Sequence, residues 1–244
     1  MMRQRHVSPH TIASYRDTFR LLFKFAQVRL RTSPSNLDLR DLDAPLITAF
    51  LDDLETQRST SVRTRNLRLT AIRSFFSFTA FEEPAYAAHI QRVLAIPSKR
   101  YDKKLVQFLT RTEIDALLAA PDRTTWLGRR DYALLLLAIQ TGLRLSELTG
   151  LDRDSVQLGR GAHVRCIGKG RKERCTPLTT HTIATLKVWL QEPSRNGAHA
   201  LFPNLRGGRL SSDSVQYLLA KYVANASAWC SSLTRKRVTP HVLR

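Results

Sequence analysis

Apolar residues recur at helical spacing through the first 96 residues of the chain. Ser8 and Pro9 supply an N-cap followed by a proline at the first helical position, and apolar side chains then occupy positions 12, 15, 19, 22, 23 and 26. Further helices are predicted over residues 44–57, 60–81 and 84–94. The third of these four helices has apolar residues on more than one face, which indicates packing on two sides. Together they predict a small helical bundle.

The pattern changes after residue 105, where helical and extended segments alternate. Thr110 and Glu113 have the spacing of a capping box, a buried helix over 131–140 ends at Gly142, and a short helix starts at Ser146. Alternating apolar positions predict strands within 156–158, 163–167 and 174–178, with a turn at 168–170. Helices return over 180–191 and 212–228. The predicted fold class is mainly α with a small antiparallel β-sheet or hairpin.

A charged stretch without apolar periodicity separates these two parts. We predict an N-terminal helical domain over residues 1–96, a basic linker over 97–104 that includes Lys103 and Lys104, and a second domain over 105–244. All ten glycines lie at or after Gly128, which favours compact helices over hairpins in the first domain.

Charge indicates the partner. The 244 residues carry 39 Lys and Arg against 20 Asp and Glu, a formal charge of +19. Residues 1–96 hold 14 basic and 9 acidic groups, and residues 97–244 hold 25 and 11, so most of the excess lies in the second part. Such an excess favours a polyanion, with nucleic acid ahead of a membrane surface. The longest apolar run, residues 133–139, is far shorter than the roughly 20 residues of a membrane span.

The cysteines and the N-terminus indicate where the protein works. Only Cys166, Cys175 and Cys230 occur, without a CxxC pair, so neither a disulfide framework nor a zinc ribbon is predicted. Residues 1–10 have no apolar core of a secretion signal. We expect a protein of the reducing cytoplasm.

Three polar motifs in the second part carry the candidate chemistry. Arg144 lies between a glycine turn and a new helix, where its guanidinium and exposed backbone N–H groups suit phosphate oxygens. Glu147, one helical turn further, can hold that guanidinium in place. Lys169 lies in the glycine-flanked turn of the predicted hairpin. His241 and Arg244 are three positions apart at a predicted helix start after Pro240, so both face one way.

Each motif alone has an ordinary structural explanation. An Arg-x-x-Glu pair is usually a surface ion pair, a basic run is usually a solvated turn, and His-x-x-Arg is usually an exposed helical face. The order and spacing of all three motifs in one chain favour a shared function instead.

The segments TGLRLSEL at 141–148, GKGRKER at 168–174 and HVLR at 241–244 resemble the motifs of tyrosine recombinases of the phage integrase family, particularly the Xer-like members. The resemblance implies an N-terminal SAM-like core-binding bundle and a catalytic domain of the DNA breaking-rejoining fold. It implies site-specific DNA recombination or integration by transesterification through a 3′-phosphotyrosyl intermediate, without metal or other cofactor. The expected partner is a double-stranded DNA recombination site, bound by a homo-tetramer on two sites at the nucleoid.

The resemblance also implies roles for single residues. Arg144 and Arg244 would hold the scissile phosphate, Lys169 would protonate the leaving oxygen, and His241 would assist by hydrogen bonding and proton transfer. Lys172 is the alternative candidate for the proton donor. Residues expected to contact DNA outside the reacting atoms are Lys103, Lys104, Arg171, Lys172 and Arg174.

The nucleophile is the feature that the motifs do not supply. In the family, the attacking tyrosine follows the His-x-x-Arg motif, whereas all six tyrosines of this sequence precede it. We therefore expect a catalytic domain truncated at its C-terminus, which binds DNA without cleaving it. A catalytically inactive DNA-binding protein derived from a recombinase is the alternative, and a type IB topoisomerase relative has less support from these motifs.

Two further expectations concern side-chain directions. The arginines of the third predicted helix, at positions 63, 65, 68 and 73, are candidates to face a DNA backbone. Strand alternation makes Cys166 and Cys175 candidates for packing residues.

Overall fold

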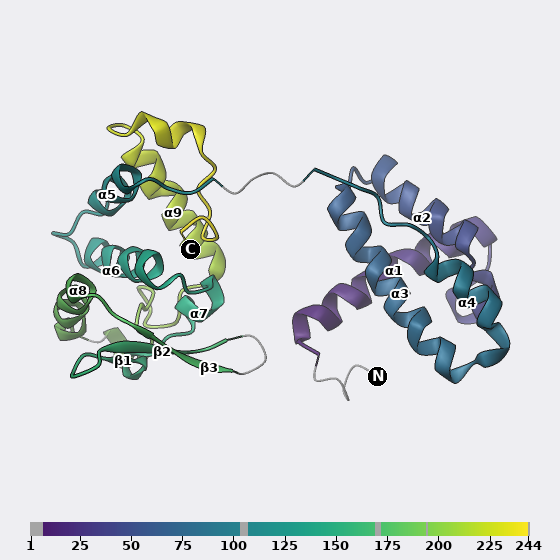
Figure 1. Ribbon diagram of the computed structural model, residues 1–244, viewed down its shortest axis with the longest axis horizontal. Helices are drawn as coiled ribbons and strands as arrows, with labels where there is room; N and C mark the ends of the chain where they lie inside the picture. Colours follow the sequence, from purple (N-terminus) through teal and green to yellow (C-terminus); the bar gives the residue numbers. More distant parts are fainter. Residues whose placement is uncertain (1–6, 103–106, 169–171, 194, 244) are drawn as a thin grey trace. The chain divides into compact units, whose positions relative to one another are not determined.

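The computed structural model describes residues 7–102, 107–168, 172–193 and 195–243. The chain divides into two compact units, residues 1–104 and 105–244 (Figure 1). The first unit is helical, and the second combines helices with a small sheet, which confirms the predicted fold class. No helix in the described part of the chain is both long and apolar enough to cross a membrane.

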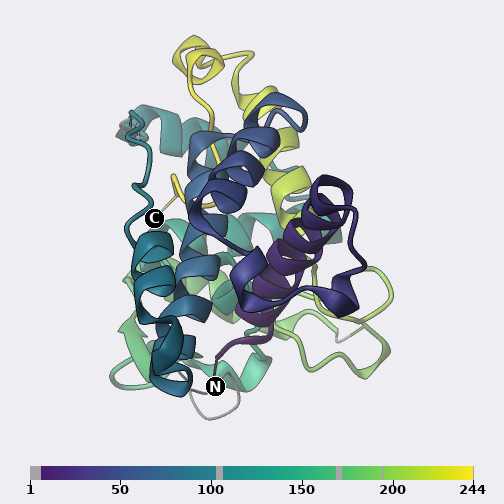
Figure 2. The ribbon, with the colours of Figure 1, turned by 90° about the vertical axis from the view of Figure 1, so that its right-hand side faces the viewer.

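The first unit is a bundle of helices, and the N-cap predicted at Ser8 is present. Ser8, Asp43 and Ser61 each accept a hydrogen bond from a backbone N–H of the first turn that follows. The fourth predicted helix starts as a 3₁₀ turn, Pro84–Tyr86, before it becomes α-helical. The helices in the described part of this unit, which Figures 1 and 2 show from two sides, are α1 (Pro9–Leu30), α2 (Ala44–Thr56), α3 (Val62–Glu82) and α4 (Ala87–Leu94).

The core of the first unit lies around α3. Phe50 of α2 and Phe76 of α3 are almost completely buried, together with Leu22 of α1 and Ile90 of α4. Helix α3 packs against α1, α2 and α4, which confirms that it is covered on more than one side. Burial of large apolar side chains of this kind is the main term that holds a bundle together.

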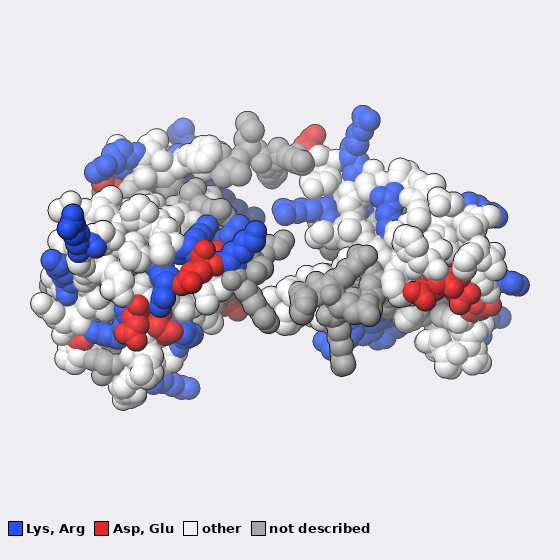
Figure 3. Space-filling model, turned by 60° about the horizontal axis from the view of Figure 1, so that its bottom comes forward, with Lys and Arg blue, Asp and Glu red and all other residues white. Residues whose placement is uncertain are grey.

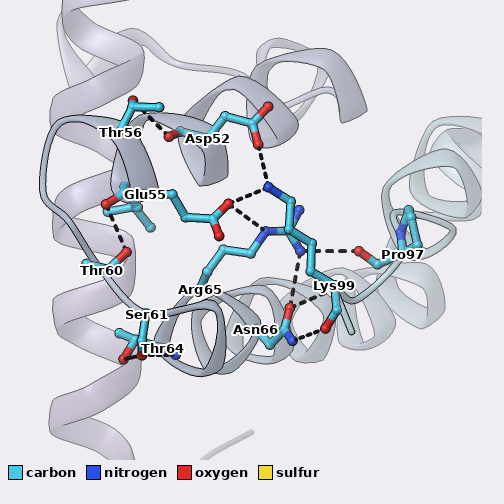
Figure 4. A network of polar contacts seen from close by, with 11 residues as sticks. Asp52, Glu55, Thr56, Thr60, Ser61, Thr64, Arg65, Asn66, Pro97 and Lys99 are labelled. Atoms are coloured by element: carbon cyan, nitrogen blue, oxygen red, sulfur yellow. Dashed lines mark hydrogen bonds and ion pairs between the residues drawn. The ribbon is translucent and has the colours of Figure 1, made fainter. Parts of the chain in front are cut away.

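The segment after α4 is fixed to the first unit by polar contacts (Figure 4). Arg65 donates to the Pro97 carbonyl at 3.2 Å, and the Asn66 side chain exchanges two hydrogen bonds with the Lys99 backbone at 2.8 and 3.1 Å. The Lys99 ammonium contacts Glu55 at 2.5 Å and Asp52 at 3.4 Å. The first three residues of the predicted linker, 97–99, are therefore held by α2 and α3.

Most of the arginines of α3 also contact other groups of the first unit. Arg65 is 3% exposed, Arg68 pairs with Asp17 at 3.0 Å, and Arg73 donates to the Ile96 carbonyl. The expectation that Arg65 faces a DNA backbone is wrong, because its buried guanidinium contacts the Pro97 carbonyl and the Glu55 carboxylate of the same unit. Arg63 is exposed.

The second unit places a three-stranded antiparallel sheet beside its helices. The strand order is β1-β2-β3, and the register pairs Cys166 with Arg174 and Arg165 with Cys175. One apolar core includes Leu134 of α6, Val164 of β2, Trp189 of α8 and Leu219 of α9. The described elements are α5 (Arg111–Ala119), α6 (Trp126–Thr141), α7 (Leu145–Thr149), β1 (Val156–Gln157), β2 (His163–Ile167), β3 (Glu173–Pro177), α8 (Thr180–Gln191), α9 (Ser212–Ala226) and the 3₁₀ helix η7 (Ser231–Arg235).

Most predicted boundaries in the second unit differ by no more than two residues, and two segments differ more. Helix α6 starts at Trp126 because Thr125 accepts a hydrogen bond from the Gly128 N–H at 3.0 Å, a cap that precedes the apolar run. The segment after Pro240 forms a turn, closed by a bond from the Val242 N–H to the Thr239 carbonyl at 2.8 Å.

A buried carboxylate joins α5 to the late segment of the chain. Glu113 is 1% exposed and accepts hydrogen bonds of 2.7 Å each from the Thr110 backbone, the Ser232 hydroxyl and the Lys236 ammonium. Burial raises the pKa of Glu113, but the hydrogen bonds from Lys236, Ser232 and Thr110 and the charge of Lys236 lower it more, to about 2. The capping box of α5 thus fixes residues 232–236.

The stability of the protein at acid pH is expected to depend on the protonation of Glu113. Since its pKa in the folded protein lies below the usual 4.5, its contribution is complete above pH 4.5 and is lost as the pH falls towards 2. We expect the free energy of unfolding of wild type to fall across this window more steeply than that of Glu113→Gln. Urea unfolding of both proteins between pH 7 and pH 3, followed by circular dichroism, measures the difference.

Removal of the partner cation tests the same contact at neutral pH. Lys236→Met leaves a buried carboxylate without its ion pair and is expected to cost about 2–4 kcal/mol of unfolding free energy. Lys187→Met is the matched control, because Lys187 is exposed on α8. Equal stability of the two variants at pH 7 would contradict this role of Glu113.

Candidate functional site

Gly142 directs the chain into the first candidate motif. Helix α6 ends there because Gly142 has φ 59° and ψ 28°, a left-handed conformation that glycine adopts without strain. Leu143 then enters the core, and Arg144 takes the N-cap position of α7. The turn therefore determines where the Arg144 side chain starts.

Glu147 holds Arg144 by both backbone and side chain. One Glu147 carboxylate oxygen accepts from the Arg144 backbone N–H at 2.7 Å, and the other accepts from Arg144 Nη1 at 3.0 Å. The Glu147 side chain is 3% exposed, whereas that of Arg144 is 42% exposed. The carboxylate is thus inside the protein, while part of the guanidinium stays open to a ligand.

Arg174 supplies a second guanidinium to the same carboxylate. Its Nη2 lies 2.6 Å from Glu147 Oε2, and its Nε donates to Cys166 Sγ at 3.3 Å. Sequence reasoning expected Arg174 to contact DNA and missed the contact with Glu147. Strand alternation alone does not reveal this contact, because it depends on the register, which places Arg174 opposite the buried Cys166.

The two arginines set the protonation state of Glu147. Burial raises the pKa of Glu147, but hydrogen bonds from Arg144 and the positive charges of Arg174 and Arg144 outweigh it, so the pKa lies below its usual value. Glu147 is therefore ionised at neutral pH and balances one of the two guanidinium charges.

Cys166 is buried, as predicted, but the prediction that Cys175 is a packing residue is wrong. Cys175 is exposed, because it pairs with Arg165 on the opposite face of the hairpin from Cys166 and Arg174. Adjacent register positions point to opposite faces of a sheet, so only one of the two sets packs against the core.

The turn of the hairpin begins beside Glu147. The Gly168 N–H donates to the Lys172 carbonyl at 2.8 Å, and a Cβ at position 168 would lie 3.2 Å from Glu147 Oε1. The candidates Lys169 and Arg171 come next in the sequence and lie outside the described residues, as do Lys103, Lys104 and Arg244. Lys172 is described and exposed.

The third motif joins the same core. Leu243 is 8% exposed and belongs to the core cluster that contains Leu143 and Leu148, the apolar residues on either side of the Arg144 motif. His241 is exposed, and no hydrogen bond joins the described side chains of His241 and Arg144. The first and third motifs thus contribute apolar residues to the same core.

Positive charge extends beyond the motifs. Figure 3 shows Lys and Arg side chains over both units, while acidic side chains gather in fewer places. An arrangement of this kind attracts a polyanion without specifying its sequence.

Comparison with protein families assigns both units. The phage integrase family matches residues 107–244, and the phage integrase N-terminal SAM-like domain matches residues 1–83. Integrase/recombinase y4rC of Sinorhizobium fredii (strain NBRC 101917 / NGR234) is 64% identical over 244 residues. The match covers all of this chain and 74% of y4rC. Tyrosine recombinase XerC of Pelotomaculum thermopropionicum is 32% identical, with 99% of this chain and 78% of that protein covered.

Solved structures share the fold. The XerH site-specific recombinase bound to a palindromic difH substrate, in a post-cleavage complex, matches with a TM-score of 0.69 at 23% identity, covering 98% of this chain and 68% of that one. The Tn1549 transposon integrase in complex with a circular intermediate DNA matches with a TM-score of 0.73 at 14% identity, covering 99% and 81%.

Close packing at Gly168 can be tested by adding one methyl group. We expect Gly168→Ala to lower the unfolding free energy by about 1–2 kcal/mol, because Glu147 is held by three hydrogen-bonded contacts and has little room to move. Gly159→Ala is the control, since a Cβ there meets nothing within 4 Å. Thermal unfolding measures both variants, and an unchanged Gly168→Ala protein would mean that the turn does not pack on Glu147.

Proposed function

Because this chain belongs to the phage integrase family of tyrosine recombinases, we propose that it serves site-specific recombination or integration of double-stranded DNA. The reaction proposed for the whole protein is a metal-independent transesterification. A tyrosine oxygen attacks the DNA phosphorus and the bond to the 5′ oxygen breaks. The resulting 3′-phosphotyrosyl link conserves the energy of the phosphodiester for rejoining.

The placement of Arg144 is the observation that carries this proposal. Its guanidinium is partly exposed at a helix N-terminus, and a buried carboxylate fixes its orientation. A guanidinium presents paired N–H donors that match the non-bridging oxygens of a phosphate. Since the negative charge on those oxygens has to be stabilised in the transition state, a pre-oriented cation lowers the barrier.

The remaining roles are proposed from the family motifs. Arg244 would be the second cation on the phosphate, Lys169 would give its proton to the departing 5′ oxygen, and His241 would assist by hydrogen bonding. Two packing facts support this assignment: Gly168, next to Lys169, lies against Glu147, and Leu243, next to Arg244, belongs to the same core as Leu143 and Leu148 of the Arg144 motif.

The tyrosines of this chain do not fit the nucleophile. All six precede His241, and the two with described hydroxyl partners are engaged elsewhere. Tyr222 is buried and donates to Asp131 at 2.7 Å, and burial together with that carboxylate raises its pKa. The Tyr132 hydroxyl lies 3.0 Å from His181 Nε2. We therefore propose that these 244 residues bind DNA and do not cleave it.

The partner is proposed from charge and family. Lys103, Lys104, Arg171 and Lys172 would contact the DNA backbone, and the complete protein would assemble as a homo-tetramer on two DNA sites. Because double-stranded DNA is the proposed substrate, the nucleoid is the proposed place of action.

The binding proposal predicts a salt-dependent affinity without covalent adducts. We expect the logarithm of the association constant for a duplex of about 30 bp to fall linearly with the logarithm of salt concentration, by about 0.9 per phosphate contact. Fluorescence anisotropy measures this slope, and a denaturing gel of the same mixtures should show no protein–DNA adduct. Salt-independent binding would contradict the DNA proposal, whereas an adduct would contradict only the absence of cleavage.

Arg144 is tested in any longer form of the protein that forms the adduct. Arg144→Ala should reduce adduct formation by at least about 100-fold, because a preorganised donor to the phosphate is lost. It should weaken duplex binding only about tenfold, the loss of one phosphate contact, because the other basic side chains are unchanged. Equal adduct formation by wild type and variant would remove Arg144 from the active site.

A further inference from the structure

Glu147 lies between two guanidiniums although one would satisfy an ion pair. Arg144 contacts both carboxylate oxygens, through its backbone N–H and its Nη1, and Arg174 contacts Oε2 at 2.6 Å. The Arg174 contact comes from β3, 27 residues further along the chain. The second arginine therefore connects the hairpin to the start of α7.

The charges of Arg144, Glu147 and Arg174, called the trio below, explain why a second arginine is needed. Arg144 and Glu147 alone would sum to zero, and the 3% exposed carboxylate lies close enough to the guanidinium to weaken its attraction for an anion. With Arg174 included, the trio carries a net charge of +1. The carboxylate can then orient Arg144 without cancelling its charge.

We propose that Arg174 is a positioning residue that neutralises Glu147, so that Arg144 remains both oriented and electrostatically available to the DNA phosphate. This rests on the proposed function, because that function assigns Arg144 to the phosphate.

The directions of the Arg174 donors favour this role over a direct phosphate contact. Its Nη2 and Nε are both used inside the protein, by Glu147 and by the sulfur of Cys166, which is 4% exposed. The pleat of the hairpin places Arg174 on the same face as Cys166, and although 40% of its side chain is exposed, these two donors are directed into the protein. Arg165, on the opposite face, pairs instead with Glu173 at 3.2 Å.

A double-mutant cycle between Glu147 and Arg174 separates the two roles. If Arg174 acts through Glu147, Arg174→Gln weakens duplex binding about five- to tenfold at about 0.1 M salt in the wild-type background, and reduces the salt slope by about 0.9. In the Glu147→Gln background the same substitution lowers the summed charge of the three positions from +2 to +1, the wild-type value, so Arg144 stays available and the effect is less than about twofold. The Glu147→Gln side chain still suits the N3 position of α7, where glutamine also accepts from the N-cap N–H.

Arg165→Gln is the matched control in the same two backgrounds. It removes one arginine from the same hairpin, but its carboxylate partner is Glu173, so its effect should be equal in the wild-type and Glu147→Gln backgrounds. Thermal unfolding of every variant confirms that each is folded. Where Arg174→Gln alone does not fold, the comparison of E147Q with E147Q/R174Q still decides, since neither leaves an unbalanced buried charge.

The binding measurements have three possible results, and each leads to a different conclusion. Loss of the Arg174 effect in the Glu147→Gln background, with an unchanged Arg165 effect, supports the proposal. An equal loss from Arg174→Gln in both backgrounds overturns it, because Arg174 would then act on the DNA independently of Glu147. Salt-independent binding by wild type would instead overturn the proposed function itself.

Discussion

Burial of the Glu147 carboxylate is the constraint on which the candidate site depends. An ionised carboxylate that is 3% exposed needs hydrogen bonds and opposite charge, because removal from water costs several kcal/mol. The structure supplies them from an N-cap backbone N–H and two guanidiniums. Satisfying one buried charge thereby fixes a helix start, a strand and, through Gly168, the beginning of a turn.

The same device occurs a second time in this unit. Glu113 and Glu147 each occupy the third position of a helix and accept from the backbone N–H of the N-cap residue. Each also recruits a cation from a later segment, Lys236 for Glu113 and Arg174 for Glu147. Local capping needs only one carboxylate oxygen, and the remaining lone pairs are free to bind distant donors. In this way two helix-capping carboxylates position Arg174, which is part of the motif at 168–174, and Lys236, which lies shortly before the motif at 241–244.

The local half of this arrangement could be predicted from the sequence, and the distant half could not. Helical spacing located the first-unit helices to within a few residues, and the glycine at 142 located the turn before Arg144. Arg174 was assigned to DNA because a basic run next to a turn has no visible partner in the sequence. Its contact with Glu147 depends on strand register, which also placed Cys175 on the exposed face. A shift of one residue in register reverses every such assignment.

The excess of positive charge is also clearer at the level of single contacts. Pairs such as Arg68 with Asp17 or Lys236 with Glu113 remove one charge of each sign, so they leave the formal excess of 19 unchanged. The ion pairs instead determine where the excess positive charge lies. It is carried by the unpaired Lys and Arg side chains, where a polyanion can reach it. Arg144 differs from both groups: it is paired, yet the additional guanidinium of Arg174 leaves it within a site of net positive charge. An arginine can therefore be held rigidly by the protein and still attract phosphate, provided that the carboxylate holding it has another partner.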